Sequence, residues 1–353
     1  MSQSLSTPNQ TQMFPANSIE ISVRGRWVRV PALAVGPTNV VVTGKWIKIA
    51  AIHDEEWLET EIEDPGVYVT KLKEEGSEVP ADIFTFTQKL PGAPPKHSGH
   101  LEWASMAAIR LPGFTKWWEK LPQETRKNVR RSQKRGVVVS VKPFNQDLIA
   151  GIRDVNDDSP LRQRIRNFHY GKSLAEIKKD YSAFLDRSDF ICAKVGNEML
   201  GFLKLVYRGE VASILHLTTK VSQSDKRPAN ALVAKAVELC EAKGISFITY
   251  GEFNYGNKRH SPLLEFKIRN GFEEILTPRF YVPLTRWGAL CIRMNLHRGA
   301  LGILPPSVIA IGLAVRAKCH NLKYVLSRCS LMPERSNRNR QMECSNPPAG
   351  SNT

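Results

Sequence analysis

The spacing of apolar residues changes twice along the chain, and each change predicts different secondary structure. Residues 19–52 contain several short runs rich in Val and Ile, separated by Gly, Pro and Asn, which is the pattern of short β-strands. A helix is expected over about 54–75 and a strand over 81–90. The Pro- and Gly-rich run 90–100 is interpreted as a linker or an active-site loop.

A second series of elements begins with the stretch "KLPQETRKNVRRSQKRGVVV", residues 120–139. Pro122 suits the first turn of a helix, and Gly136 can take the left-handed conformation that ends one. The stretch therefore predicts a helix that runs directly into a strand. Two amphipathic helices are expected near 145–155 and 172–187.

Residues 189–219 predict three antiparallel strands, because "GNE" and "RGE" supply the residues that tight hairpin turns need. The next segment is a helix that ends at Gly244 and has Leu232, Ala236 and Cys240 on one face. A strand ("ISFITYGEF"), a short helix ("SPLLEFKIRNGF") and a last strand ("RFYVPL") complete the series. This order of elements is that of a GNAT acyltransferase core.

The element order divides the chain into two blocks, 18–112 and 114–284. A helix, a Gly and a strand recur in them as "LKEEGSEVPADIFTFTQ" and "CEAKGISFITYGEF", so we interpret the first block as a degenerate, shortened copy of the second. A C-terminal helical segment is expected over 285–330. Residues 1–17 and 331–353 have the polar composition of disordered segments.

The balance of charges favours an anionic partner. The 353 residues carry a formal net charge of +16, and an apolar fraction of 42% is enough for a substantial core. Nucleic acid, a phosphorylated cofactor, an acidic polymer and anionic lipid all fit this charge. The six Cys include no CxxC pair and the N-terminus has no apolar leader, so we expect reduced thiols in a cytoplasmic protein. His97 and His100 have the spacing of metal ligands, but their loop offers no carboxylate or thiol, and no metal is predicted.

The uncharged run 299–315 raises the question of contact with lipid. It is shorter than the roughly 18 to 20 residues of a spanning helix, and Pro305 and Pro306 interrupt it. A helical pair packed on the core is the favoured interpretation. The alternative is peripheral contact with the inner face of the membrane.

Cations gather on the helix at 122–135. They form two ridges spaced by four residues: Arg126, Arg130, Lys134 and Lys127, Arg131, Arg135. Such a surface is either a solvated face or a binding site for phosphate. We assign Arg126, Arg130, Arg131 and Lys134 to a phosphorylated substrate.

Three motifs resemble those of FemAB-like proteins, a group within the GNAT superfamily. "LPQETRKNVRRSQKRGV" resembles their basic helix, "PANALVAKAVELCEAKGISFITYG" their A-N-x-L helix with the following strand, and "LLEFKIRNGF" their F-K-x-x-x-G-F element. The three occur in the family's order and cover about 114–284, whereas the first block matches only in layout. The resemblance implies an α/β (α+β) fold of tandem GNAT-like domains with mixed central sheets.

The same resemblance implies transfer of an acyl or aminoacyl group from an activated donor to an amine, an EC 2.3 activity of cell-envelope and polysaccharide biosynthesis. It implies no permanently bound cofactor, with acyl-coenzyme A or aminoacyl-tRNA as co-substrate. Two departures leave the donor open. The loop "KVSQSDKRPANA" lacks the Gly-rich run that holds coenzyme A in ordinary GNAT enzymes, and Thr249 stands where many relatives have Asp.

The candidate catalytic residues lie in the last strand–helix pair. Lys267 matches the Lys of the family's Phe-Lys pair, which implies a place at the acyl-donor site with Phe266 beside it. There it would stabilise the oxyanion or the donor's charge, as an exposed or cleft-facing residue. Glu252 is the candidate base or proton relay, with Tyr250 and Tyr255 as proton donors. The alternative for Lys267 is a solvated lysine on a short helix, and the alternative for Glu252 is a residue at a strand end with no catalytic role.

Donor phosphates are expected at the start of the helix after the meander. Amides near Ala229 and Asn230 would face the ligand, with Lys226 and Arg227 beside them; the alternative is an ordinary surface helix.

The predicted function is N-acyl transfer to an amine, and the sequence does not identify which amine is the acceptor. The competing hypothesis is a non-catalytic RNA-binding protein on a degenerate GNAT scaffold. A tRNA-dependent aminoacyltransferase would combine the two, with the basic helix as the tRNA platform.

Overall fold

The structure is a computed structural model that describes residues 17–23, 25–55, 61–91, 94–162, 165–254 and 261–299. All of them belong to one compact unit, residues 1–304. The predicted disordered termini and nearly all of the run 299–315 lie outside the described residues. In the helices that are described, none combines the length and the apolar character that crossing a bilayer requires.

The first half of the unit, residues 18–110, consists mainly of strands. Its elements are β1 (Ser18–Val23), β2 (Arg26–Val35), β3 (Thr38–Thr43), β4 (Ile49–Ile52), α1 (Pro65–Glu74), β5 (Ile83–Thr87) and β6 (His100–Arg110).

The second half, residues 114–283, opens with helices and then alternates strands and helices. Its elements are α2 (Phe114–Lys120), α3 (Gln123–Lys134), β7 (Val138–Lys142), α4 (Gln146–Asp157), β8 (Leu161–Arg162), β9 (Ile165–Arg166), α5 (Leu174–Tyr181), η2 (Leu185–Arg187), β10 (Ser188–Val195), β11 (Glu198–Arg208), β12 (Val211–Thr219), η3 (Ser224–Lys226), α6 (Pro228–Ala242), β13 (Phe247–Glu252), α7 (Pro262–Arg269) and β14 (Glu273–Pro283). The segment α8 (Arg286–Arg293) and η4 (Leu296–Arg298) follows.

One supersecondary unit occurs in both halves. In the first, β2, β3 and β4 form an antiparallel meander, α1 follows, and β5 lies parallel to β4. In the second, β10, β11 and β12 form the meander, α6 follows, and β13 lies parallel to β12. Each copy has its own apolar core, one around Phe84 and Phe86 and the other around Leu203 and Leu232.

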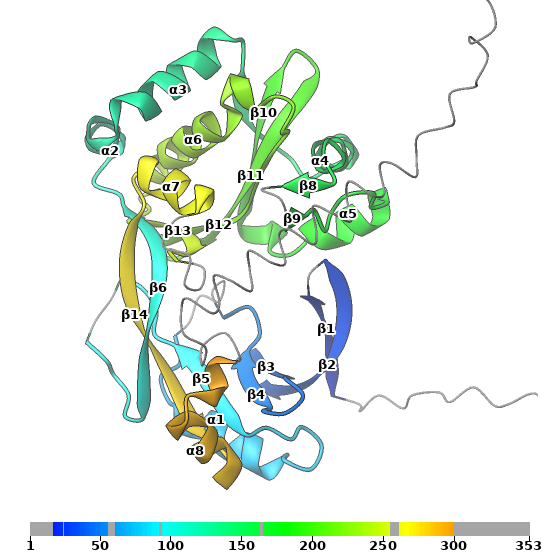
Figure 1. Cartoon of the computed structure of the whole chain (residues 1–353), viewed down its shortest axis with the longest axis vertical. Coiled ribbons are helices and arrows are strands. Elements are labelled where there is room, and N and C mark those ends of the chain that lie inside the picture. Colours follow the sequence, from blue (N-terminus) through cyan, green and yellow to red (C-terminus); the bar gives the residue numbers. More distant parts are fainter. Residues whose placement is uncertain are drawn as a thin grey trace, which may run out of the picture. The chain divides into compact units, whose positions relative to one another are not determined.

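The two halves exchange their last strands, and this exchange joins them into one sheet. The strand order is β1-β2-β3-β4-β5-β14-β6-β13-β12-β11-β10-β7. β14, from the second half, pairs with β5 of the first, while β6, from the first half, pairs with β13 of the second. β6 and β14 also pair with each other along nearly their whole length, and Figure 1 shows them side by side.

Most predicted elements are confirmed. The meander over 189–219, the helix that ends before Gly244 and the basic helix that runs into a strand are all present. The predicted helix over 54–75 is wrong in its extent, because Asp54 has a left-handed conformation and the helix starts only at Pro65, after the capping side chain of Asp64. The helix expected over 172–187 likewise ends at Tyr181.

β6 was not predicted. Its segment "HLEWASMAAIR" contains three Ala residues and no alternation of apolar and polar positions, so it has little intrinsic preference for a strand. Pairing on both edges, with β13 and with β14, compensates for this weak local preference. Tertiary context therefore sets the structure here.

The helix α8 lies against the start of β5 because Gly288 has no side chain. A Cβ at this position would lie 1.9 Å from the backbone oxygen of Asp82. Cys291 and Ile292, one turn further, pack on Ile83. This close contact fixes where η4 begins.

Gly288→Ala should therefore weaken the protein by about 1–3 kcal/mol, the usual cost of overpacking a close contact. Ala289→Ser, at the exposed neighbouring position, is the matched control and should change stability by less than about 0.5 kcal/mol. Urea unfolding followed by circular dichroism measures both. Equal midpoints for the two variants would show that α8 does not depend on the close approach.

Candidate functional site

β12 and β13 pair only at their beginnings and then separate. Val211–Ser213 lies opposite Phe247–Thr249, and β12 continues to Thr219 while pairing only with β11 on its other edge. The register between β11 and β12 shifts at Leu215, which is a β-bulge that bends the strand. Beyond Ser213, the edge of β12 that faces β13 has no strand partner in the described part of the chain.

A pair of hydroxyl groups marks the point of separation. Ser213 and Thr249 are both buried, and their side-chain oxygens lie 2.7 Å apart in a hydrogen bond. Thr249 is the residue at which the sequence differs from the Asp of the motif that it resembles. Its hydroxyl, unlike a carboxylate, can share a proton with Ser213 without placing a charge between the strands.

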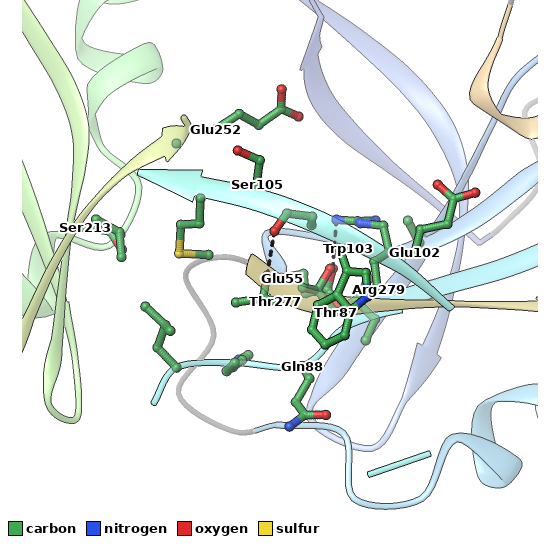
Figure 2. Close-up of a pocket in the computed structure, with 18 of the residues that line it drawn as sticks. Glu55, Thr87, Gln88, Glu102, Trp103, Ser105, Ser213, Glu252, Thr277 and Arg279 are labelled. Carbon is green, nitrogen blue, oxygen red and sulfur yellow. Dashed lines mark hydrogen bonds and ion pairs between the residues drawn. The ribbon is translucent and has the colours of Figure 1, made fainter. Parts of the chain in front are cut away.

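A cavity of about 710 Å³ opens beside this pair. Its polar wall comes from both halves and from the exchanged strands: Glu55, Thr87, Gln88, Lys89, Glu102, Ser105, Arg208, Ser213, Thr249, Glu252, Asn254, Thr277, Arg279 and Tyr281. Figure 2 shows Ser213 and Glu252 at one end and Glu55, Thr87 and Arg279 gathered around β14 and β6.

Charged groups of both signs face this cavity. The Arg279 guanidinium lies 3.8 Å from the Glu55 carboxylate, which also accepts a hydrogen bond from the backbone N–H of Thr87 at 2.5 Å. Burial raises the pKa of Glu55, although the charge of Arg279 opposes this effect. Burial lowers the pKa of Lys89 to about 8, and the positive charge of Arg208 is the second-largest cause of this decrease. Such a lysine can lose its proton near neutral pH.

Lys267 lies behind the end of β13 and is fully buried. Its ammonium group donates a hydrogen bond of 2.6 Å to the backbone oxygen of Glu252 and lies 4.8 Å from the ring centroid of Tyr250. The expectation of an exposed or cleft-facing lysine that contributes little to the core is therefore wrong. α7 presents Lys267 to the interior, because its other face carries the exposed Ile268 and Arg269.

The C-terminal end of α7 is fixed by polar contacts from three other helices. The indole N–H of Trp117 donates to the backbone oxygen of Asn270 at 3.2 Å, and the Thr125 hydroxyl donates to that of Arg269 at 2.9 Å. The Asn230 amide donates to the Asn270 side chain at 3.1 Å. Asn230 thus connects the start of α6 to the helix that carries Phe266 and Lys267.

The start of α6 leaves its first amides uncapped by any side chain. Arg227 precedes the helix in a left-handed conformation, and Pro228 occupies the first turn. Lys226 contacts Gln223, and an ion pair between Arg135 and Asp225 holds this turn to the end of α3. Free amides at a helix N-terminus bind anions, so the predicted phosphate role of Ala229 and Asn230 stays a prediction with suitable geometry.

The basic helix α3 buries Thr125, Val129 and Ser132 and exposes its cations. Arg130, Arg131 and Lys134 are exposed and Arg126 is half-buried. The Arg130 guanidinium lies 5.9 Å from the ring centroid of Trp118. None of these four cations lines the described cavity. Of the predicted catalytic residues that the structure describes, only Glu252 does, while Lys267 and Tyr250 lie behind the cavity wall.

Sequence reasoning missed most of the cavity wall. Glu55, Lys89, Arg208 and Arg279 come from four separate segments and carry no local motif. Tyr255, a predicted proton donor, lies outside the described residues. Glu252 is exposed and lines the cavity, and its role as a base stays a prediction.

The two copies of the meander–helix–strand unit in one mixed sheet agree with the predicted tandem GNAT-like fold. The chain resembles the C-terminal DUF2156 domain of a protein from Agrobacterium fabrum assigned as a lysylphosphatidylglycerol synthetase, with a TM-score of 0.51 and 15% identity over 75% of this chain and 87% of that one.

Two further solved structures are similar at lower scores. L-PGS from Bacillus licheniformis gives a TM-score of 0.49 at 15% identity over 76% of this chain and 87% of that one. FemX gives a TM-score of 0.45 at 9% identity over 74% of this chain and 88% of that one. No protein-family model and no curated protein matches the sequence.

If α3 binds a phosphorylated ligand, Arg130→Glu combined with Arg131→Glu should abolish binding of tRNA in a filter assay. The melting temperature should change by no more than a few degrees, since exposed substitutions usually change stability by about 0.5 kcal/mol or less. Arg153→Glu with Lys178→Glu makes the same change in charge at exposed positions of α4 and α5 and should keep most of the binding. Equal losses in the two double variants would assign the effect to net charge alone.

Proposed function

We propose that the protein is an N-acyltransferase that moves an acyl or aminoacyl group from an activated donor to an amine bound in the cavity. The observation that carries this proposal is the separation of β12 from β13 at the Ser213–Thr249 pair, beside a cavity with charged walls. An unpaired strand edge offers backbone N–H and C=O groups to an extended ligand. The reactive end of a donor bound along β12 would reach the cavity at Ser213.

The start of α6 supports a donor that carries phosphates. The uncapped amides of Ala229 and Asn230 point out of the helix, and the positive end of the helix dipole favours an anion there. Lys226 and Arg227 add two cations beside these amides. The same group of residues can serve acyl-coenzyme A or the phosphates of an aminoacyl-tRNA.

The cavity supports an acceptor that carries both an amine and an acidic group. Glu55 and Glu252 offer carboxylates to an ammonium group, and Arg208 and Arg279 offer guanidinium groups to a carboxylate or phosphate. A zwitterionic ligand can pair with wall groups of both signs, whereas an apolar amine can pair only with the carboxylates. The walls therefore favour a zwitterionic acceptor.

The transfer forms a C–N bond between the amine and the donor carbonyl and breaks the bond to the leaving sulfur or oxygen. Glu252 takes the proton that the attacking amine loses, and Tyr250 supplies one to the leaving group. Lys267 fixes the end of β13 through the Glu252 carbonyl and places a positive charge behind the developing oxyanion.

The exposed cations of α3 support aminoacyl-tRNA as the donor, because a polyanion can contact α3 and the start of α6 together. The similarity to a domain assigned to lysylphosphatidylglycerol synthetase supports the same choice and a role at the cell envelope, from the cytoplasmic side. The second candidate function, RNA binding without catalysis, rests on α3 alone.

Arg227→Gly tests the donor site without straining the fold. Gly suits the left-handed conformation of this residue, so the variant should be at least as stable as the parent protein while donor affinity falls about 5–10-fold. Asn295→Gly, at another left-handed position, is the matched control and should leave affinity unchanged. Titrations with acetyl-coenzyme A, aminoacyl-tRNA and deacylated tRNA measure the effect. If no donor stabilises the protein and all nucleic acids bind alike, the RNA-binding alternative is correct.

Lys267→Met should lower the rate of acyl transfer about 100-fold, the size expected on losing one oxyanion stabiliser, and should also cost about 1–3 kcal/mol of stability. Lys204→Met is the matched control. Lys204 is also fully buried and donates to a backbone carbonyl, that of Tyr181 at 2.8 Å. Its partner Tyr181 does not line the cavity, whereas Glu252, the partner of Lys267, does. Rates are compared at equal amounts of folded protein. A normal rate in Lys267→Met would leave Lys267 a structural residue only.

A further inference from the structure

His100, Glu102 and His297 bring three potential metal ligands together at the rim of the cavity. The Nε2 atoms of His297 and His100 lie 2.7 Å and 3.3 Å from the Oε1 atom of Glu102. One ligand atom from each residue lies within 4.8 Å of the other two. Two imidazoles and one carboxylate form a ligand set that binds zinc and other first-row transition metals.

The backbone places these side chains before any ion binds. His100 and Glu102 are two residues apart on β6 and so point to the same face of the sheet. Their partners on β14 are Tyr281 and Arg279, and the Tyr281 ring centroid lies 4.6 Å from that of His297. Ligands on a paired strand keep their geometry better than ligands on a loop.

His297 reaches this site through the close contact of α8 with β5. Gly288 allows that approach, and η4 then turns His297 into the interior, where its side chain is fully buried. Its Nδ1 atom is buried and has no hydrogen-bond partner among the described residues, whereas Nε2 contacts Glu102. Nε2 is the atom that would bind the ion.

A tetrahedral ion needs side-chain shifts at His297. Zinc bonds of about 2.0–2.1 Å place neighbouring ligand atoms about 3.3 Å apart. His100 and Glu102 already have this separation, whereas Nε2 of His297 lies 2.7 Å from Glu102 and has to move away from it. The ligand atoms of the two histidines lie within 4.8 Å of each other and have to reach the same separation. Three protein ligands leave one coordination position for water or for a group in the cavity.

Arg298 competes with the ion for the same carboxylate oxygen. Its Nε atom donates to Oε1 of Glu102 at 2.9 Å, but 46% of its side chain is exposed, so it can turn into solvent. His97 is not part of the site, because its ring packs edge-on against Phe86 and Phe280. The expectation that His100 lacks a nearby carboxylate is wrong, since Glu102 lies next to it on the same strand face.

We propose that His100, Glu102 and His297 bind one divalent transition-metal ion, with Zn²⁺ as the fitting ion. The ion joins η4 to β6. Because Glu102 and Tyr281 line the cavity, the ion also places a positive charge beside it. The site stands on its own geometry and does not require acyl transfer.

The test uses the full chain after dialysis against a chelator. Isothermal titration with Zn²⁺ should give one site per chain with a micromolar or lower Kd, and Co²⁺ should give visible absorption bands of a tetrahedral centre. Zn²⁺ should also raise the melting temperature by mass action. His100→Ala, Glu102→Gln and His297→Gln should each weaken binding about 100-fold or more.

Two variants keep the result interpretable if a ligand variant folds poorly. His53→Ala removes a histidine that pairs with Asp54 at 3.2 Å, and it should keep full Zn²⁺ binding. Arg298→Ala removes the competitor and should tighten binding several-fold without removing a ligand. Absence of a one-to-one site in the parent chain, or unchanged affinity in all three ligand variants, overturns the proposal.

Discussion

The exchange of β6 and β14 between the halves is the constraint on which the rest of the structure depends. Each strand obtains its hydrogen bonds from the other half, so neither half can complete its sheet alone. The cavity lies over these two strands, and its walls come from β5 on one side and from β12 and β13 on the other. Because backbone pairing on both edges fixes β6, residues from distant segments meet in a defined geometry.

The arrangement of the strands also determines which polar groups can be buried. Lys267 can be buried because the Glu252 carbonyl, beyond the point where β13 separates from β12, accepts a hydrogen bond from its ammonium group and because Tyr250 offers the face of its ring. The contacts from Trp117, Thr125 and Asn230 then hold the end of α7 in place. A change in the strand register would break the hydrogen bond between this ammonium group and the Glu252 carbonyl.

How far the sequence alone predicts this protein depends on the range of the contacts. The meander over 189–219 and the helix α6 were predictable, because hairpin turns and apolar periodicity are local signals. β6 was not, since its Ala-rich segment becomes a strand only between two partners. The contact of His297 with Glu102 was not predictable either, because the two residues lie 195 positions apart and the position of α8 brings them together. Lys267 was found through its motif, but its burial was not.

The distribution of charge explains why the net charge of +16 predicts only one part of the function. Part of the excess of cations is on the exposed face of α3 and at the start of α6, where it can attract an anion over long distances. The cavity instead balances Glu55 against Arg279 and lowers the pKa of Lys89 by burial. Under the proposed function, the exposed cations would attract the donor, while the paired charges of the cavity would select the acceptor. Composition does not encode the short-range geometry of these pairs, so the sequence alone could not predict an acceptor.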